Sequence, residues 1–431
     1  MTENISLGLT RLFPNFKDIN FGMILISTYI LFDFGSFQGI FEIVNNLRLP
    51  YIVALLSVVY ALYLVLNKRV DFNSATTKSM FILCFIIIAY SQISTKNLAD
   101  KQANLTLFLQ YLANYIILIS CVKKPWQFIF IIDVWLFGIL HSSYHAIYQG
   151  GKLWDSIWLK DENHISLICA YAIPFAFFLH LNYKSKLKKL FYIACLAFFV
   201  SSVVIASSRG GLVTMVVMGF LCWLFVKNKF RSFLLILITV ILIFQFAPAR
   251  FFEEAESLQQ GTKEGTADER IYSWGLAFLM FKDHPMIGVG PYNYKEYFQL
   301  YDYEERFGAA RGSKAFAKRV AHSTPVEFLA EFGIVGYIVL IALHISIYRN
   351  WKTIKKLKKL KNEDKVIKDD YILYETITHA CAFTYLGFWI AATFLSLLPY
   401  PFLWILIPFS EAWKNITLNY VEQRNKVPSL T

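Results

Sequence analysis

Charged residues are scarce in this sequence. Asp, Glu, Lys and Arg make up 17% of the 431 residues, and 56% of the residues are hydrophobic. A soluble domain has roughly 25% charged and about 45–50% apolar residues. An aromatic content of 17% suits lipid-facing surfaces and interfacial belts. This composition excludes an ordinary water-soluble domain and predicts an integral membrane protein.

Several signatures of soluble enzymes are missing as well. There is no P-loop and no G-x-G-x-x-G after a strand, so we expect no nucleotide cofactor. The six cysteines all lie inside or at the end of apolar runs, which favours buried apolar side chains over disulfides or a metal site. No A-x-A site follows the first apolar run, and we expect no cleavable signal peptide.

The net charge of +12 does not indicate nucleic-acid binding. Lys and Arg fall in short clusters between apolar runs, and no basic stripe with interleaved aromatic residues is present. A nucleic-acid partner is therefore not expected. The clusters instead suit contact with the membrane surface.

Twelve apolar runs of spanning or near-spanning length predict about 12 transmembrane helices. The last two meet at the Pro-containing segment 397–401 and could form one broken unit. The runs are 21–37, 51–67, 79–93, 104–122, 126–149, 164–183, 188–206, 209–226, 231–247, 325–348, 371–395 and 397–412.

The basic residues predict the orientation. If the N-terminus is cytoplasmic, 26 of the 42 Lys and Arg residues lie in cytoplasmic segments and 6 in the short connectors outside. Short connectors dominate the positive-inside rule, so both termini are predicted to be cytoplasmic. The predicted organisation is helices 1–9 in 1–247, a periplasmic loop at 248–323, helices 10–12 in 324–412 and a cytoplasmic tail at 413–431.

The long outside loop is predicted to be functional. A stretch around Arg270–Phe281 has the pattern of an amphipathic helix lying on the membrane surface. Pro285, Gly288, Gly290 and Pro291 follow as a turn cluster.

Arg209 is predicted at the outer end of the eighth span. The N-terminus of that helix carries a partial positive charge, which is unfavourable for the positive charge of Arg209. An anion bound between the guanidinium and the free N–H groups would remove that conflict, and the two glycines that follow allow close backbone approach. Snorkelling to lipid phosphates is the alternative. Arg270, which opens the loop helix, could bind a second phosphate through its planar fork, or form a surface ion pair.

His322 lies just before the tenth span. Thr324 is a plausible N-cap, Pro325 the first helical residue and Glu327 the partner in a capping box, so helix entry needs no contribution from the histidine. A neutral imidazole at the outer face suits proton abstraction from a hydroxyl, although a lone interfacial histidine is more often inert.

Two further histidine positions have competing explanations. His164, with Asn163, opens the sixth span and is either part of a helix cap or a ligand contact. His141 and His145 share one helix face, but no acidic partner supports a metal site there.

Three segments together resemble the O-antigen ligase/polymerase superfamily of bacterial envelope glycosyltransferases. They are 207–211 (SSRGG), which follows Asn163 and His164, then 270–294, and then 322–336 (HSTPVEFLAEFGIVG). They cover roughly residues 160–340. One departure is Ser323, where the family often has Asn after the motif histidine, and this affects the expected acceptor contact.

The resemblance implies a multi-span, metal-independent glycosyltransferase of the bacterial inner membrane with no cofactor. Its donor would be a glycan on undecaprenyl diphosphate, and its acceptor a hydroxyl of lipid A–core or another glycan at the periplasmic face. Arg209 and Arg270 would hold the diphosphate, and His322 would activate the acceptor with inversion at the anomeric carbon. Further donor or acceptor contacts are expected from Asn163, His164, Tyr272, Gly288, Gly290, Ser323 and Glu327.

Other functions stay open. Within the superfamily, a polysaccharide polymerase or a protein O-oligosaccharyltransferase would use the same donor. A transporter or flippase of lipid-linked sugars is the alternative from another class, but it predicts polar residues near the middle of the bilayer on broken helices of repeated halves. Here the polar set clusters at one face. The absence of a large extra C-terminal domain favours the ligase.

Overall fold

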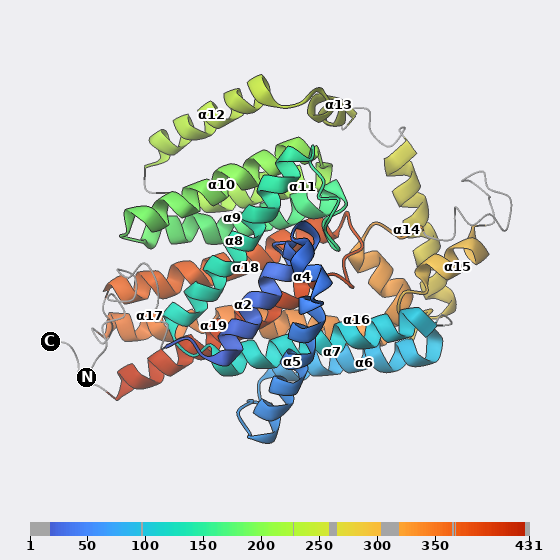
Figure 1. Cartoon of the computed structure of the whole chain (residues 1–431), viewed down its shortest axis with the longest axis horizontal. Helices are drawn as coiled ribbons and strands as arrows, with labels where there is room; N and C mark the ends of the chain where they lie inside the picture. Colours follow the sequence, from blue (N-terminus) through green and yellow to red (C-terminus); the bar gives the residue numbers. More distant parts are fainter. Residues whose placement is uncertain are drawn as a thin grey trace.

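Helices form all the regular structure of the described residues, which are 18–95, 98–226, 228–257, 265–302, 319–363, 366 and 368–426 of the computed structural model (Figure 1). The chain order is α2 (Phe21–Asp33), α3 (Phe37–Ile40), α4 (Glu42–Asn46), α5 (Leu49–Leu66), α6 (Ala75–Ser94), α7 (Leu98–Cys121), α8 (Pro125–Tyr148), α9 (Glu162–Asn182), α10 (Lys186–Ala206), α11 (Arg209–Trp223), α12 (Lys229–Phe246), α13 (Ala249–Ser257), α14 (Gly265–Asp283), α15 (Tyr294–Tyr301), α16 (Thr324–Trp351), α17 (Ile354–Asn362), α18 (Lys368–Ala392) and α19 (Pro401–Asn425).

Seven of these helices are long and apolar enough to cross a membrane by length and composition: α5 to α10 and α16, the last counted together with α17. The predicted runs at 21–37 and 209–226 form shorter apolar helices, α2 and α11. The all-helical membrane class is therefore supported. The count of twelve spans stays a prediction, because several predicted spans are short or carry charged residues.

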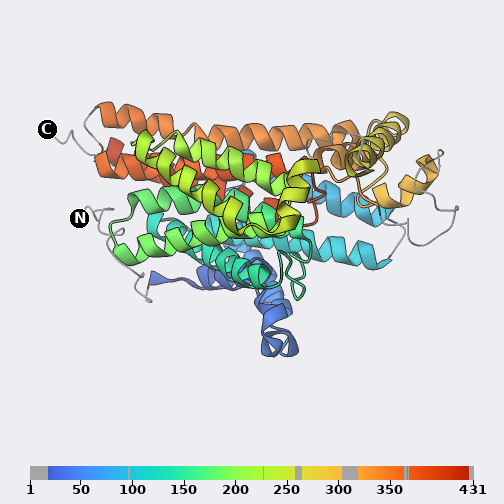
Figure 2. The ribbon, with the colours of Figure 1, turned by 90° about the horizontal axis from the view of Figure 1, so that it is seen from above.

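Helix α9 lies at the centre of the bundle. It packs against α8, α10, α11 and α18, and most of its side chains are buried, including the internal Pro174. One continuous apolar core surrounds it. Seen along its length, the bundle has α14 and α15 at one end and the lysine-rich α17 at the other (Figures 1 and 2).

Helix α14 contains the predicted amphipathic stretch, but one of its faces packs on protein. Leu276, Ala277 and Met280 are buried in a small second core with residues of α15 and α16. Ile271 and Phe278 remain 51% and 60% exposed. The helix thus has an apolar side against α16 as well as apolar residues available to lipid. Residues 258–264 and 303–318 of the predicted loop lie outside the described residues.

Helix α16 corresponds to the predicted run 325–348 but is broken at Gly333, whose φ of +57° and ψ of −156° are not helical. The segment 285–290, between α14 and α15, fills the break. The N–H groups of Val289 and Gly290 donate to the carbonyl oxygens of Ala330 and Glu331 (2.9 and 3.0 Å). Beyond the break, the N–H groups of residues 334 and 335 donate to the carbonyl oxygens of residues 285 and 286 (2.8 and 3.1 Å). The loop therefore satisfies backbone groups that the broken helix leaves unpaired.

The last two apolar runs form separate helices, not one broken unit. The Tyr420 hydroxyl near the end of α19 donates to the Asp370 carboxylate at the start of α18 (2.7 Å), so the two helices are antiparallel. Helix α19 continues to Asn425, well beyond the predicted span end at 412. Most of the predicted tail at 413–431 is thus helical, and 427–431 lie outside the described residues.

Candidate active site

The turn that carries His322 is held in place at Ala321, the residue before the histidine. The Trp274 indole of α14 donates to the Ala321 carbonyl oxygen (3.0 Å). The Ala321 N–H donates to the Glu327 carboxylate of α16 (3.0 Å). His322 itself has a φ of +50°, a left-handed conformation that histidine adopts more readily than most residues. The side chain is therefore presented from a rigid turn and is exposed.

The start of α16 differs from the predicted capping box. Pro325 does lie in the first turn, but the N-cap is Ser323, and no side chain caps the helix. Thr324 instead contacts the α18–α19 connection: its N–H and its hydroxyl both donate to the Leu395 carbonyl oxygen (2.7 and 2.6 Å). The Glu327 carboxylate accepts from Ala321 and from the Ser396 hydroxyl. Thr324 and Glu327 therefore pair with residues of the distant α18–α19 connection and not with each other's backbone in a local cap.

Arg270 and Arg319 lie close enough to His322 to act on its ionisation. Desolvation by the surrounding protein, followed by the positive charge of Arg270 and then that of Arg319, lowers the pKa of His322 below its ordinary value. Asp161 and Glu269 oppose this shift, and Glu269 is paired with Arg319 at 3.1 Å. The imidazole is thus biased toward its neutral form, which can accept a proton.

The N-termini of α9 and α11 are joined directly. Ser208, the N-cap of α11, accepts from the Gly211 N–H (3.3 Å), and its hydroxyl donates to the Asn163 side-chain oxygen (2.7 Å). The Asn163 amide in turn donates to Asp161, the N-cap of α9 (2.8 Å). A Cβ at position 211 would lie 1.7 Å from the Ser166 hydroxyl oxygen. Gly211 is therefore required for close helix packing, in addition to any contact with an anion.

Arg209 is the first residue of α11, as predicted, and a series of contacts connects its position with His322. A Cβ on the neighbouring Gly210 would lie 3.3 Å from Phe394. The next residue of that connection, Leu395, accepts the hydrogen bonds of Thr324, two residues after His322. The structure thus brings the backbone positions of Arg209 and His322 to the same end of the bundle. That all three side chains line one cavity stays a prediction.

His164 lies beside this cluster. Its Nδ1 is 3.1 Å from the Trp158 carbonyl oxygen, its ring lies 4.4 Å from the Tyr400 ring, and it interacts electrostatically with His322. Sequence reasoning did not identify Tyr400, Trp158, Ser396 or Arg319 as part of this region. The Pro-Tyr-Pro at 399–401 was the one available signal for a rigid turn there.

The remaining predicted ligand contacts have structural partners. The Tyr272 hydroxyl donates to Asp302 (2.5 Å) and so ties α14 to the residue after α15. Gly288 and Gly290 have positive φ and lie in the segment that fills the α16 break. A Cβ at position 288 would lie 2.3 Å from the Glu331 carbonyl carbon. These contacts explain the glycines without a ligand, and their role in binding stays a prediction.

The two neighbouring histidines of α8 take part in packing. The His141 Nδ1 lies 2.8 Å from the Gly35 carbonyl oxygen, and its ring is 4.7 Å from that of His145. Within the described ranges, no group of three or more His, Cys, Asp or Glu residues is arranged to hold a metal ion.

Residues 194–341 match the family described as O-antigen ligase. The matched segment runs from α10 to α16 and includes Arg209, Arg270 and His322. No curated protein matches the chain.

Proposed function

Because the match at 194–341 supports membership of this chain in the O-antigen ligase superfamily, we propose that the chain is a glycosyltransferase acting at the periplasmic face of the bacterial inner membrane. It transfers a glycan from undecaprenyl diphosphate to a hydroxyl of lipid A–core. The twelve-span arrangement with both termini in the cytoplasm is part of this proposal.

The observation that carries the proposal is the neighbourhood of His322. A histidine that is exposed, biased toward its neutral form and close to Arg270 combines a proton acceptor with a cation. Arg209 begins a helix at the same end. Together these groups suit a reaction in which a hydroxyl loses a proton while a diphosphate leaves.

In the proposed step, the acceptor oxygen forms a bond to the anomeric carbon as the bond from that carbon to the diphosphate oxygen breaks. The electron pair of the broken bond leaves with undecaprenyl diphosphate, and the acceptor proton passes to His322. Arg270 and Arg209 stabilise the growing negative charge with planar, permanently charged forks. Attack from the side opposite the leaving group inverts the anomeric carbon.

The α16 break is relevant to the transporter alternative, since discontinuous helices often form the binding sites of transporters. In this chain, four main-chain hydrogen bonds from the 285–290 segment occupy the broken turn. Those backbone groups are therefore paired with protein and not presented to a substrate. This observation favours the enzyme.

The test is glycan transfer from purified donor to lipid A–core in detergent containing EDTA. We expect wild-type transfer to persist with EDTA, and His322→Ala and Arg270→Ala each to lose at least about a hundredfold, or ~2.7 kcal/mol. Arg270→Lys should recover only part of the activity, because it keeps the charge but loses the fork. His284→Ala, an exposed histidine at the end of α14, is the matched control and should retain activity.

Three results would redirect the proposal. Lengthening of the donor glycan would identify a polymerase, and transfer to a protein hydroxyl would identify an oligosaccharyltransferase. Movement of donor across liposomes without any transfer would identify a transporter.

A further inference from the structure

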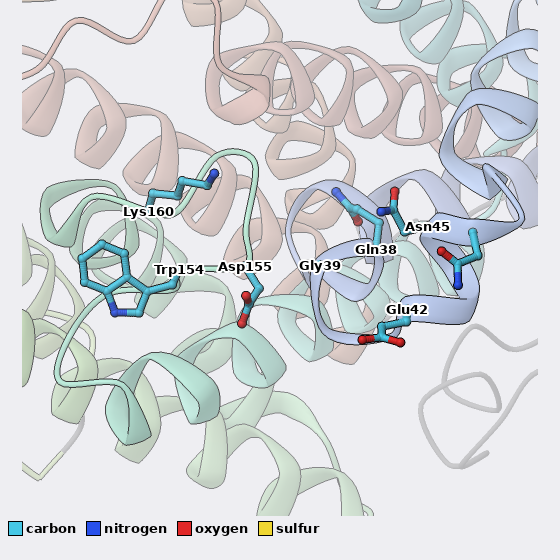
Figure 3. A pocket seen from close by; sticks show the side chains of 8 residues that line it. Gln38, Gly39, Glu42, Asn45, Trp154, Asp155 and Lys160 are labelled. Carbon is cyan, nitrogen blue, oxygen red and sulfur yellow. The ribbon is translucent and has the colours of Figure 1, made fainter.

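A polar groove lies between the α3–α4 segment and the loop that connects α8 to α9. Its volume is about 630 Å³. Gln38, Glu42 and Asn45 stand on one side, and Trp154, Asp155 and Lys160 stand on the other (Figure 3). We call it the α3–α4 groove.

The two sides of the groove are joined by close backbone packing at its base. A Cβ on Gly39 would lie 1.6 Å from the Asp155 carbonyl oxygen, so no other residue fits there without displacing the loop. The Ser36 hydroxyl donates to the Ser156 hydroxyl (2.7 Å), and both serines are buried. Close backbone contact therefore fixes the base of the groove.

Gln38 has an unpaired side-chain acceptor next to the groove. The residue is 6% exposed, and its side-chain oxygen finds no hydrogen-bond partner among the described residues. Unpaired buried acceptors are rare in folded proteins. Because this oxygen is buried, it can accept a hydrogen bond from a ligand in the groove that Gln38 lines only when the side chain turns outward.

The other groups in the groove define the chemistry of that ligand. The Trp154 indole is 61% exposed, with the Lys152 ammonium 5.4 Å from its ring centroid. Exposed aromatic rings bind the C–H faces of sugars, and amides and carboxylates pair with hydroxyl groups. Glu42 and Asp155 outnumber Lys160, which disfavours a phosphate and favours a neutral saccharide.

The groove also lies close to the proposed base. Lys160 directly precedes Asp161, whose negative charge acts on His322. Exposed apolar residues lie on the segments that form the groove, with Ile43 at 67% and Ile157 at 59% exposure. Such residues suit contact with the outer membrane–water interface. The arrangement fits a saccharide that is itself anchored in the membrane.

From these observations we infer that the α3–α4 groove binds a saccharide unit of the membrane-anchored acceptor and holds it outside the reacting centre. The inference rests on the proposed function for the direction of transfer. It assigns Gln38 and Trp154 to acceptor binding, with no part in the chemical step.

The kinetic test uses Gln38→Leu and Trp154→Ala in the full chain. We expect each to raise KM for lipid A–core by about tenfold, as for the loss of one hydrogen bond or stacking contact, with kcat and the donor KM unchanged. Tyr148→Ala is the matched control, because Tyr148 is 87% exposed and lies outside the groove lining. An unchanged acceptor KM, or a loss confined to kcat, would overturn the inference.

A binding test separates this inference from the proposed function. Saturation-transfer NMR would follow delipidated core oligosaccharide on the full chain in nanodiscs. Binding that is retained in His322→Ala but lost in Trp154→Ala and Gln38→Leu supports the groove, even if no transfer is found and the proposed function fails. Equal binding by wild type and the two groove variants, or no binding by wild type, overturns the groove assignment.

Discussion

His322 combines a left-handed backbone with an ionisation shifted toward the neutral form. A non-glycine residue in that conformation costs about 1–2 kcal/mol, and the hydrogen bonds of Ala321 to Trp274 and Glu327 hold the turn in place. Strain that neighbouring contacts maintain is typical of functional positions. The imidazole therefore starts from a fixed backbone position and is biased toward the neutral form, which can accept a proton.

The depressed pKa of His322 predicts the pH dependence of transfer. A general base must be neutral, so the acid limb of kcat/KM should lie below the ordinary histidine value of about 6.5. Arg319→Gln removes one of the positive charges that lower this pKa, and it also frees Glu269, whose charge raises it. The acid limb should therefore move to higher pH. A pH–rate profile would check this, and a limb that stays in place or moves down would contradict the role of His322.

The same shift has a consequence for stability. Because the folded-state pKa of His322 lies below the unfolded value, its neutral form is favoured in the fold. Its contribution is present above about pH 6.5 and is lost as the pH falls toward the folded pKa.

Glu327 is a positioning residue in this structure. Its carboxylate accepts from the backbone beside His322 and from Ser396. Glu327→Ala should lower kcat by roughly tenfold or more, the effect of leaving buried donors unpaired at ~1–3 kcal/mol, with the donor KM little changed. Glu327→Gln, which keeps one acceptor oxygen, should recover most of the loss. Steady-state kinetics on both variants would test this role. An equal loss of kcat in Glu327→Gln and Glu327→Ala would contradict it and indicate that the negative charge itself is needed.

Single residues show what sequence patterns can and cannot predict. Arg209 lies at a helix start, as its motif predicted, and Arg270 acts electrostatically on His322. That the three side chains line one cavity stays a prediction. The partners of Glu327 and Thr324 were not predictable, because Ser396 and Leu395 lie about 70 positions away and no local pattern connects them. The capping box was a reasonable local solution, but a tertiary contact replaced it.

At the scale of elements, the least predictable feature is the break in α16. The run 325–348 is apolar on both sides of Gly333, so hydropathy alone predicts one continuous span. The break depends on the 285–290 segment, which lies more than forty residues earlier in the chain and supplies the missing hydrogen bonds. The Tyr90 hydroxyl of α6 also fixes this segment through the Gly288 carbonyl oxygen (2.9 Å).

Replacement of Gly333 by Ala should therefore destabilise the protein. The added Cβ would lie 2.6 Å from the Pro285 carbonyl oxygen, at a positive φ, and we expect a loss of at least about 2 kcal/mol. Gly275→Ala in α14 is the matched control, since a Cβ there meets nothing within 4 Å, and it should be neutral or slightly stabilising. Thermal unfolding in detergent would compare the two variants. Equal melting temperatures would show that the backbone at position 333 does not require glycine.

At the scale of the whole molecule, the two ends differ in charge and in role. The lysine-rich α17 lies opposite α14 and α15 (Figure 1). Its Leu357 and Leu360 are buried, while several lysines are exposed. This asymmetry agrees with the basic bias of the connectors, which predicts α17 in the cytoplasm.

Cysteine labelling would test this orientation. With Cys121, the one cysteine that is not fully buried, replaced by Ser, we expect a membrane-impermeant maleimide to modify Lys282→Cys on α14 in cells with a permeable outer envelope. Lys358→Cys on α17 should react only after the inner membrane is opened. Both positions are exposed, which makes them matched probes. Reaction of Lys358→Cys from outside would invert the topology.

Composition predicted the class of the whole molecule, and the run lengths predicted many of its helices. The described structure differs from the predicted runs where contacts between helices set the helix length. Helices α2 and α11 are shorter than a span. Helix α19 extends past its predicted end because its later turns pack on α18. Hydropathy measures preference for lipid and does not report such helix-to-helix contacts.

The break in α16 also constrains the order of biogenesis. Gly333 lies nine residues into the helix, about 13 Å along its axis, so its backbone groups would be costly to leave unpaired in lipid. Their partners at 285–290 leave the ribosome before α16 does. If the loop is periplasmic, as in the proposed orientation, it crosses the membrane before α16 is inserted. The first turns of that helix then reach their final form only by folding back onto chain made earlier.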